Sequence, residues 1–157
     1  RAADAGYERY EVSAFSERGS RCRHNLNYWK FGDYIGIGAG AHSKITDRQG
    51  IWRCAREKHP RRYIETTATK QSPPSLQSVS GSALAFEFAL NALRLKEGFT
   101  VALFEQRTGL SWESLSGTLA EAEERGLLKV NTDRVCATPL GYRFLDDLIE
   151  LFLPVSA

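Results

Sequence analysis

Methionine is absent from this sequence of 157 residues, and cysteine and histidine occur only three times each. Cys22, Cys54 and Cys136 lie far apart, and their spacing fits neither a disulfide framework nor a zinc site. We therefore expect reduced thiols and a cytoplasmic protein. Thiols this scattered also exclude the closely spaced cysteine ligands that an iron–sulfur cluster requires.

Long apolar runs are missing as well. No stretch approaches the roughly 20 apolar residues of a transmembrane helix, so no transmembrane segment is expected. The opening residues, RAADAGYERYE, are charged and lack the apolar core of a secretory signal peptide. Because they resemble the interior of a helix and no initiator methionine precedes them, we expect the sequence to be a piece of a longer protein.

The net charge is small but unevenly distributed. The sequence is 42% apolar and 25% charged, as in ordinary globular proteins, and its formal net charge is +2. Residues 1–70 carry a net charge of +6, residues 71–110 are neutral, and residues 111–157 carry −4. This asymmetry indicates two units with different tasks.

A polar stretch separates these two units. Residues 66–82, TTATKQSPPSLQSVSGS, are rich in Ser, Thr, Gln and Pro and poor in large apolar side chains, which is typical of a linker. We therefore predict a first part over residues 1–70, a linker over 71–81 and a second part over 82–157.

The first part has the pattern of short strands and loops. Alternation predicts a strand over residues 7–15, and an apolar run predicts another strand that begins at Asp33. Between them, residues 22–29 predict a loop or a short helical turn. A strand and a turn are expected over residues 51–59, and Pro60 is placed to begin a short helix.

The second part predicts three helices and a hairpin. Apolar periodicity predicts helices over residues 82–98, 101–109 and 111–126. The run LLKV, the turn NTD and the run RVCATP then predict two antiparallel strands, and a last helix follows. Three helices followed by a hairpin is the order of elements in a winged-helix domain.

Caps and inward faces can also be assigned in this part. Ser111 is placed to cap the third helix, and Thr138, followed by Pro139, is placed to cap and begin the last one. The residues expected to face inward on these two helices are Leu115, Leu119, Ala122, Leu140, Phe144, Leu145, Leu148, Leu151 and Phe152.

Winged-helix domains often bind DNA, which makes a nucleic acid an alternative ligand. Such binding depends on Lys and Arg that contact phosphates. The third helix, taken over residues 111–125, has four glutamates against Arg125 alone and a net charge of −3. This helix would repel a phosphate backbone, so we expect no specific nucleic-acid binding and interpret the domain as a packing module.

Three motifs give the sequence a family resemblance. The segments GYERYEVSAFS, HNLNYW and DYIGIGAGAHS, in this order, resemble the oxygen-independent coproporphyrinogen III oxidase-like branch of the radical SAM proteins. His24, Asn25, Tyr28 and Trp29 form an H-N-x-x-Y-W pattern similar to the haem chaperone subgroup, HemW. The segments EFALNALRLKEGF and TPLGYRFLDDLIELFL are similar to the C-terminal domain of the same family.

The resemblance covers nearly the whole chain and implies a longer parent protein. In this family a C-x-x-x-C-x-x-C triplet in an α/β barrel holds a [4Fe–4S] cluster, to which S-adenosylmethionine binds. That triplet is absent here. The implied fold class is therefore α+β: the end of a radical SAM barrel, with strands and a short helix over residues 1–70, followed by a winged-helix-like C-terminal domain.

The resemblance makes haem the expected ligand of one short segment. The imidazole of His24 would be the metal ligand to the iron. Two aromatic rings would stack on the porphyrin, two guanidinium groups would pair with its propionates, and an amide would orient the imidazole. The expected haem-binding residues are Arg21, Arg23, His24, Asn25, Tyr28 and Trp29.

Each of these side chains also has a plainer interpretation, which the residues alone leave open. A single histidine in a polar loop most often forms only hydrogen bonds. The aromatic rings would equally well close the bottom of a barrel, and the arginines would equally well lie on a solvated face. Cys22 is an alternative iron ligand, although the C-x-x-C-H motif of covalent haem attachment is absent.

A second candidate site is the glycine-rich segment that ends in His42. Gly36, Gly38 and Gly40 permit close approach to the backbone, but they do not form the G-x-G-x-x-G pattern of a dinucleotide site. In the family context we expect Gly38, Gly40, Ala41 and His42 at the cofactor edge of the barrel, near S-adenosylmethionine. The alternative is that His42 only forms a hydrogen bond across the strand end.

Together these patterns predict the C-terminal portion of a haem chaperone, whose parent binds haem and passes it to a recipient apo-protein. The alternative is an enzyme, an oxygen-independent coproporphyrinogen III oxidase that decarboxylates its substrate in porphyrin biosynthesis. The H-N-x-x-Y-W pattern favours the chaperone. Because the cluster ligands are absent, we expect this chain to have no catalytic activity of its own.

Overall fold

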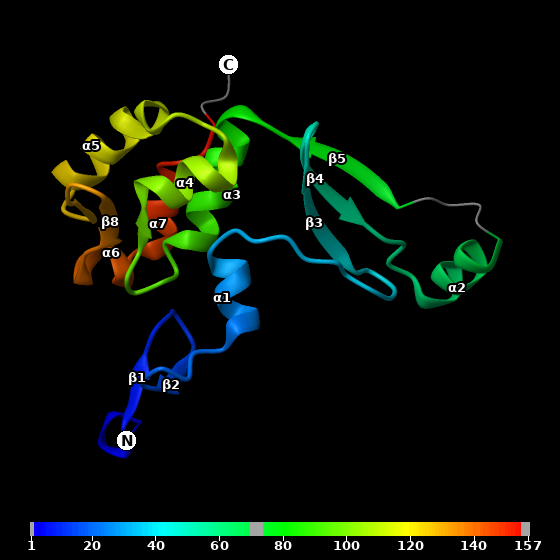
Figure 1. The fold of residues 1–157 in the computed structure, drawn as a ribbon, viewed down its shortest axis with the longest axis horizontal. Helices are drawn as coiled ribbons and strands as arrows, with labels where there is room; N and C mark the ends of the chain where they lie inside the picture. The colour runs from blue at the N-terminus through cyan, green and yellow to red at the C-terminus, as the bar shows by residue number, and fades with distance from the viewer. Residues whose placement is uncertain (1, 70–73, 155–157) are drawn as a thin grey trace. The chain divides into compact units, whose positions relative to one another are not determined.

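The computed structural model describes residues 2–69 and 74–154. The chain forms two compact units, of which unit 1 combines Arg1–Phe31 with Gly81–Ala157 and unit 2 is Gly32–Ser80 (Figure 1). The N-terminal residues therefore belong to the same compact unit as the C-terminal part of the chain. The division predicted from composition, at residues 71–81, stays a prediction about domains.

The C-terminal part of unit 1 has the predicted order of three helices and a hairpin. Strand β8 lies in the middle of its sheet and pairs antiparallel with β6 and β7. The mixed α and β character predicted for the chain is confirmed. The elements of this part are α3 (Gly81–Ala92), β6 (Phe99–Thr100), α4 (Val101–Thr108), the 3-10 helix η2 (Trp112–Leu115), α5 (Ser116–Glu124), β7 (Leu128–Val130), β8 (Arg134–Ala137), α6 (Pro139–Arg143) and α7 (Leu145–Glu150).

The core of unit 1 is built around Phe88 of α3. Its ring is fully buried and meets three other rings edge to face, with centroid distances of 5.7 Å to Phe31, 4.9 Å to Phe99 and 5.2 Å to Phe104. Edge-to-face pairs of this kind add to the stabilisation from apolar burial. Because α3 is apolar nearly all round, it can serve as the central helix of the unit.

Local signals explain the start of α6. The Thr138 hydroxyl accepts a hydrogen bond from the Gly141 N–H at 3.0 Å, and Pro139 follows it at the first helical position, as predicted. The predicted cap by Ser111 is wrong, because this side chain bonds to the Glu113 carboxylate and makes no capping bond to the backbone.

The last helix differs from its prediction. The backbone leaves the helical conformation at Phe144 and divides the predicted helix into α6 and α7. Of the residues expected inward on it, Leu148 and Phe152 are buried, whereas Leu140 is 45% exposed and Phe144 is 46% exposed. The break turns the helix, so a single apolar stripe does not continue across it.

The N-terminal part of unit 1 is a hairpin rather than one strand over residues 7–15. Strands β1 (Tyr7–Arg9) and β2 (Phe15–Glu17) pair antiparallel, after a short 3-10 helix η1 (Ala3–Ala5). The chain turns because the Glu11 carboxylate accepts hydrogen bonds from both the backbone N–H and the hydroxyl of Ser13. Helix α1 (Arg23–Trp29) follows the hairpin.

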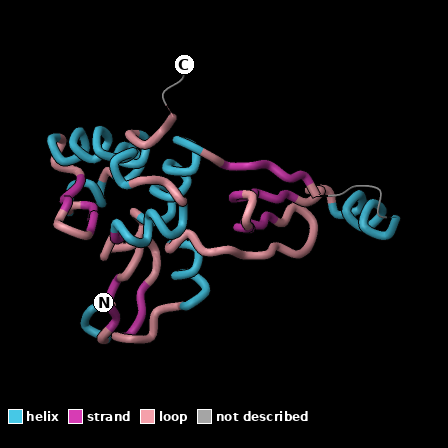
Figure 2. The backbone as a smooth tube through the Cα atoms, turned by 45° about the horizontal axis from the view of Figure 1, so that its top comes forward, coloured by secondary structure: helices cyan, strands magenta, loops and turns pink. Residues whose placement is uncertain are grey.

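Unit 2 is an antiparallel sheet of three strands, and a helix follows the second strand in chain order, before the third (Figure 2). Its elements are β3 (His42–Asp47), β4 (Gly50–Ala55), α2 (Pro60–Thr69) and β5 (Ser75–Val79). The predicted strand after residue 50 and the predicted helix at Pro60 are confirmed. The strand predicted at Asp33 is wrong, since only Tyr34 pairs there, in an isolated bridge to Lys44.

Strand β5 lies inside the stretch predicted as a linker. It pairs with β4 along its whole length, yet only Val79 of its residues is buried. An edge strand that is mostly exposed keeps a polar composition, so the sequence resembles a loop. Residues 71–73 of the predicted linker lie outside the described residues.

Candidate functional site

Helix α1 carries five of the six residues predicted to bind haem, and its geometry places four of them in two pairs. The segment forms a helix of 7 residues, more regular than the loop or short turn that the sequence predicts. Residues four apart share a helix face. His24 therefore lies beside Tyr28, and Asn25 lies beside Trp29.

The first pair combines an exposed residue, His24, with a partly exposed one, Tyr28. His24 is exposed, and its imidazole meets the Tyr28 ring edge to face, with centroids 4.8 Å apart and planes at 78°. Within residues 2–69 and 74–154, no hydrogen bond or ion pair engages the imidazole of His24 or the guanidinium of its exposed neighbour Arg23. This face therefore offers a metal-binding nitrogen, an aromatic ring and a cation together.

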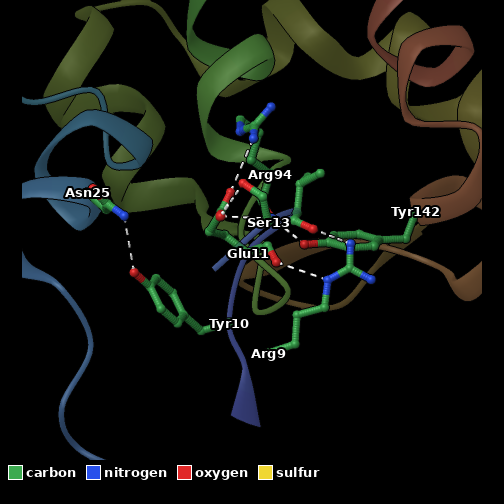
Figure 3. A network of polar contacts seen from close by, with 8 residues as sticks. Arg9, Tyr10, Glu11, Ser13, Asn25, Arg94 and Tyr142 are labelled. Carbon is green, nitrogen blue, oxygen red and sulfur yellow. Dashed lines mark hydrogen bonds and ion pairs between the residues drawn. The ribbon is translucent and has the colours of Figure 1, made fainter. Parts of the chain in front are cut away.

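The second pair fixes the helix to the rest of unit 1. The Asn25 side-chain N–H donates to the Tyr10 hydroxyl at 3.3 Å, so its amide already has a partner outside α1 (Figure 3). The Arg94 guanidinium lies 4.4 Å from the centroid of the Trp29 ring. Trp29 is thus covered on one ring face by a cation of the same chain, in a geometry that stabilises both groups.

Arg21, just before α1, is also engaged within the chain. Its guanidinium lies 2.6 Å from the Glu97 carboxylate and 5.8 Å from the centroid of the Tyr10 ring. Both members of the ion pair are more than one third exposed. Arg21 is therefore a weaker candidate for an anionic ligand than Arg23, because binding would have to compete with an existing carboxylate.

A buried carboxylate, that of Glu11, pairs with the same Arg94 guanidinium that covers Trp29. Glu11 is 1% exposed, accepts two hydrogen bonds from Ser13 at 2.8 and 2.9 Å, and pairs with the Arg94 guanidinium at 3.2 Å (Figure 3). Burial acts to raise the pKa of Glu11, but the Ser13 hydrogen bonds and the Arg94 charge outweigh it and lower the pKa. The ionised carboxylate thereby holds Arg94 over Trp29.

The other end of this network lies at the C-terminal part of the unit. The Tyr142 hydroxyl donates to the Arg94 carbonyl at 2.6 Å, and the Arg9 guanidinium lies 5.1 Å from the Tyr142 ring centroid. Burial raises the pKa of the Tyr142 hydroxyl. The network therefore connects α1, the N-terminal hairpin and α6 through one set of polar contacts.

Sequence reasoning missed the residues of this network. Glu11 and Arg94 are 83 positions apart, and although both lie in segments that resemble the family, the sequence assigned no role to either. In the alternating segment over residues 7–15, Glu11 falls on the polar side, where a charged residue is ordinary, so the sequence gives no signal that this carboxylate is buried. Such a carboxylate requires a buried partner, but its identity depends on the fold.

The glycine-rich segment before His42 lies in unit 2, where its backbone groups bond within the chain. The Gly40 N–H donates to the Glu57 carbonyl at 2.7 Å, and the Gly36 N–H donates to the Ser43 hydroxyl at 2.9 Å. A Cβ on Gly36 would lie 2.1 Å from the carbonyl oxygen of His42. The close approach that requires glycine at position 36 is therefore made by the chain's own backbone.

The other predicted cofactor residues lie in the same turn. Gly38 and Gly40 have φ values of +107° and +70°, and the Ala41 carbonyl accepts a hydrogen bond from the Arg56 N–H at 2.9 Å. His42 is exposed at the start of β3. The turn brings Gly38, Gly40, Ala41 and His42 together, and their predicted role at a cofactor stays a prediction.

The cysteines do not form a cluster site. All three are unpaired, with Cys22 and Cys136 in unit 1 and Cys54 in unit 2. In the described part of the chain, no group of three or more His, Cys, Asp or Glu side chains could hold a metal ion. The residues present therefore do not fit a [4Fe–4S] cluster. Among the helices described, none has the length and apolarity needed to cross a bilayer.

Sequence comparison supports the predicted resemblance. Residues 79–144 match the family described as HemN C-terminal domain. The chain is 41% identical over 150 residues to "Heme chaperone HemW" of Escherichia coli (strain K12), covering 95% of this chain and 39% of that protein. It is 40% identical over 152 residues to "Heme chaperone HemW" of Haemophilus influenzae, covering 95% and 38%.

More distant relatives carry the same name. "Heme chaperone HemW" of Mycobacterium tuberculosis (strain H37Rv) is 34% identical over 155 residues, covering 98% of this chain and 37% of that protein. The chain thus spans less than two fifths of the length of these relatives. The resemblance to HemW-like proteins that the H-N-x-x-Y-W pattern indicates is confirmed.

One solved structure shares the fold. It is described as "Coproporphyrinogen III oxidase (HemN) from Escherichia coli is a Radical SAM enzyme" and aligns with a TM-score of 0.65, covering 96% of this chain and 38% of that chain. Sequence identity is 14%, so this similarity concerns the fold alone. The predicted α+β fold is supported at that level.

Proposed function

We propose, from the match of residues 79–144 to the HemN C-terminal domain and the similarity to the HemW relatives, that this chain is the C-terminal part of a haem chaperone. Its parent would bind haem and pass it to a recipient apo-protein. The cytoplasm is the compartment we expect, since the cysteines are unpaired. A [4Fe–4S] cluster and S-adenosylmethionine would belong to a part of the parent that this chain does not contain.

The observation that carries the proposal is the solvent face of α1. This face carries the exposed imidazole of His24, the Tyr28 ring that meets it edge to face, and the guanidinium of the adjacent Arg23. All three groups come from a stretch of six residues. Haem presents an iron, a flat apolar macrocycle and two carboxylates, and these three side chains are complementary to those features.

The six predicted residues divide into two roles in this proposal. His24 would donate to the iron, Tyr28 would pack on the macrocycle, and Arg23 would pair with a propionate. Asn25, Trp29 and Arg21 would act as positioning residues, because each already has a partner within unit 1. The roles that the sequence predicts for Asn25 at the imidazole and for Trp29 at the porphyrin face stay predictions beside this division.

The enzyme alternative has less support. A coproporphyrinogen III oxidase also handles a tetrapyrrole, and HemN shares the fold of this chain. The names of the relatives at 34–41% identity nevertheless favour the chaperone over the oxidase. The H-N-x-x-Y-W residues favour the same choice, because an exposed iron donor suits haem rather than an iron-free porphyrinogen.

The test of this proposal is a haem titration of His24→Ala, followed by absorption spectroscopy. If the imidazole ligates iron, the variant should show a shifted Soret band and an affinity weakened by about tenfold or more, which corresponds to about 1.4 kcal/mol. The titration should be run on this chain and on the full-length parent.

His59→Ala is the matched control, because His59 is another exposed histidine and lies in unit 2. This variant should bind haem like the unaltered protein. If His24→Ala keeps both the spectrum and the affinity of the unaltered parent, His24 is not the ligand. An equal effect of the two substitutions would indicate non-specific binding through exposed histidines and would also contradict the proposal.

A further inference from the structure

Unit 1 has a cleft whose charged lining residues are all cations. None of the residues that line it belongs to α1. The volume of the cleft is about 660 Å³. Arg9 comes from β1, Lys96 follows α3, and Arg143 ends α6. The remaining lining residues, Ala137, Thr138, Pro139 and Tyr142, carry no carboxylate.

The three cations differ in how they are held. The Arg9 guanidinium donates to the Glu11 carbonyl at 3.1 Å and to the Val12 carbonyl, and it stacks on Tyr142. Lys96 and Arg143 are exposed, and in the described part of the chain neither forms a side-chain ion pair or hydrogen bond. The cleft thus combines one preoriented guanidinium with two cations available for an anion.

Both hydroxyls of the cleft are already used within the chain. The Tyr142 O–H donates to the Arg94 carbonyl at 2.6 Å, and the Thr138 O–H donates to the Gly126 carbonyl at 2.7 Å while accepting from Gly141. The side-chain groups of the cleft that can still bind a polar ligand are therefore its cations. Its other walls are apolar and are formed by the Tyr142 ring with Ala137 and Pro139.

A neighbouring hollow of about 580 Å³ shows the contrast. It shares Arg9 and Lys96 with the first cleft, but Glu8 and Glu97 also line it. Glu97 already pairs with Arg21 at 2.6 Å. The positive charge of the second hollow is therefore largely balanced, whereas that of the first cleft is not.

We propose that the cleft lined by Arg9, Lys96 and Arg143 is a binding site for a carboxylate carried on a small apolar molecule. The cations would bind the carboxylate, and the Tyr142 ring with the apolar walls would bind the body of the molecule. A volume of about 660 Å³ is typical of small-ligand pockets rather than of protein interfaces. The site does not depend on haem binding by α1.

The test uses 1-pyrenebutyrate, a fluorescent carboxylate with a flat apolar body, and its methyl ester, which lacks the charge. We expect saturable binding of the carboxylate, about tenfold tighter than that of the ester, and weaker binding as salt is added. The double variant Lys96→Gln/Arg143→Gln should weaken carboxylate binding about tenfold and leave ester binding unchanged. Both side chains are exposed, so the variant should fold normally.

The matched control is Arg18→Gln/Lys129→Gln, which removes the same charge from exposed positions of unit 1 outside the cleft. It should change the affinity for pyrenebutyrate less than twofold. Equal effects of the two double variants, equal binding of acid and ester, or no saturable binding would each overturn the proposal.

A peptide that contains two glutamates serves as a further arm of the experiment. Tighter binding of this peptide than of pyrenebutyrate would assign the cleft to a protein segment and would overturn the small-molecule proposal. His24→Ala should leave pyrenebutyrate binding unchanged, so failure of this site and failure of the haem proposal are distinguishable.

Discussion

Glu11→Gln is the substitution that most directly tests the network behind α1. The carboxylate is 1% exposed, and its Oε2 lies 3.2 Å from an Arg94 nitrogen. A glutamine oxygen can keep the two hydrogen bonds from Ser13, but its amide would then direct N–H groups at the Arg94 guanidinium. The variant thus removes the charge pairing while the side-chain shape is preserved.

The expected cost follows from the burial of this pair. Breaking a fully buried ion pair costs about 3–5 kcal/mol. The Arg94 side chain is 30% exposed and keeps its stacking on Trp29, so solvent screening brings the cost to the lower end of that range or below it. We expect the free energy of unfolding to fall by about 2–3 kcal/mol at neutral pH.

The pH dependence provides a second and sharper test. Because folding lowers the pKa of Glu11, its ionised carboxylate stabilises the folded protein at neutral pH. This contribution is lost as the pH falls through the folded-state pKa, which lies below the usual glutamate value of about 4.3. The difference in stability between the unaltered protein and Glu11→Gln should therefore shrink progressively in acid.

Urea unfolding, followed by the helical circular dichroism signal at several pH values, measures both quantities. Glu8→Gln is the control, since Glu8 is an exposed glutamate of β1, and it should change stability by less than about 0.5 kcal/mol. A Glu11→Gln variant as stable as the unaltered protein at neutral pH, or a difference that persists in acid, would refute the argument.

Two further predictions concern the backbone and the domain surface. Gly98→Ala should lower the free energy of unfolding by more than about 3 kcal/mol, because Gly98 has a φ of +63° and a Cβ there would lie 1.8 Å from the Val135 carbonyl oxygen. Gly109→Ala is the control: Gly109 has a φ of +69° but open space around it, so this substitution should cost only about 1–2 kcal/mol. If thermal unfolding shows that the two alanine variants lose the same stability, the clash argument is contradicted. Residues 82–157 should show no sequence-dependent binding to duplex DNA, because four glutamates lie on η2 and α5 and would repel the phosphate backbone. Tight, sequence-dependent binding in a low-salt titration would show this prediction to be wrong.

Local signals were sufficient for much of the C-terminal part of the fold. Thr138 and Pro139 specify a helix start through contacts with residues two or three positions away, and the structure has that start. Leu115, Leu119 and Ala122 are spaced for one helical face, and all three are buried. Such features depend on short-range geometry, so they can be predicted from a single sequence.

Other features depended on partners distant in the chain. Ser75–Val79 are polar enough to indicate a linker, and only their pairing with β4 makes them a strand. Leu140 and Phe144 fit an inward stripe by spacing, but the break at Phe144 leaves both nearly half exposed. Neither the strand partner nor the break has a local signal strong enough to be recognised in the sequence.

For the candidate site, the sequence by itself determined which side chains gather between Arg21 and Trp29, and the family resemblance of this segment indicated haem. Only the tertiary structure decided which of them are available. A helix places His24 beside Tyr28 and Asn25 beside Trp29, but helical spacing does not say which pair faces the protein. That choice is made by Tyr10 and Arg94, since a partly buried hydrogen bond and a guanidinium stacked on an indole hold the second pair against unit 1 and leave the imidazole in solvent.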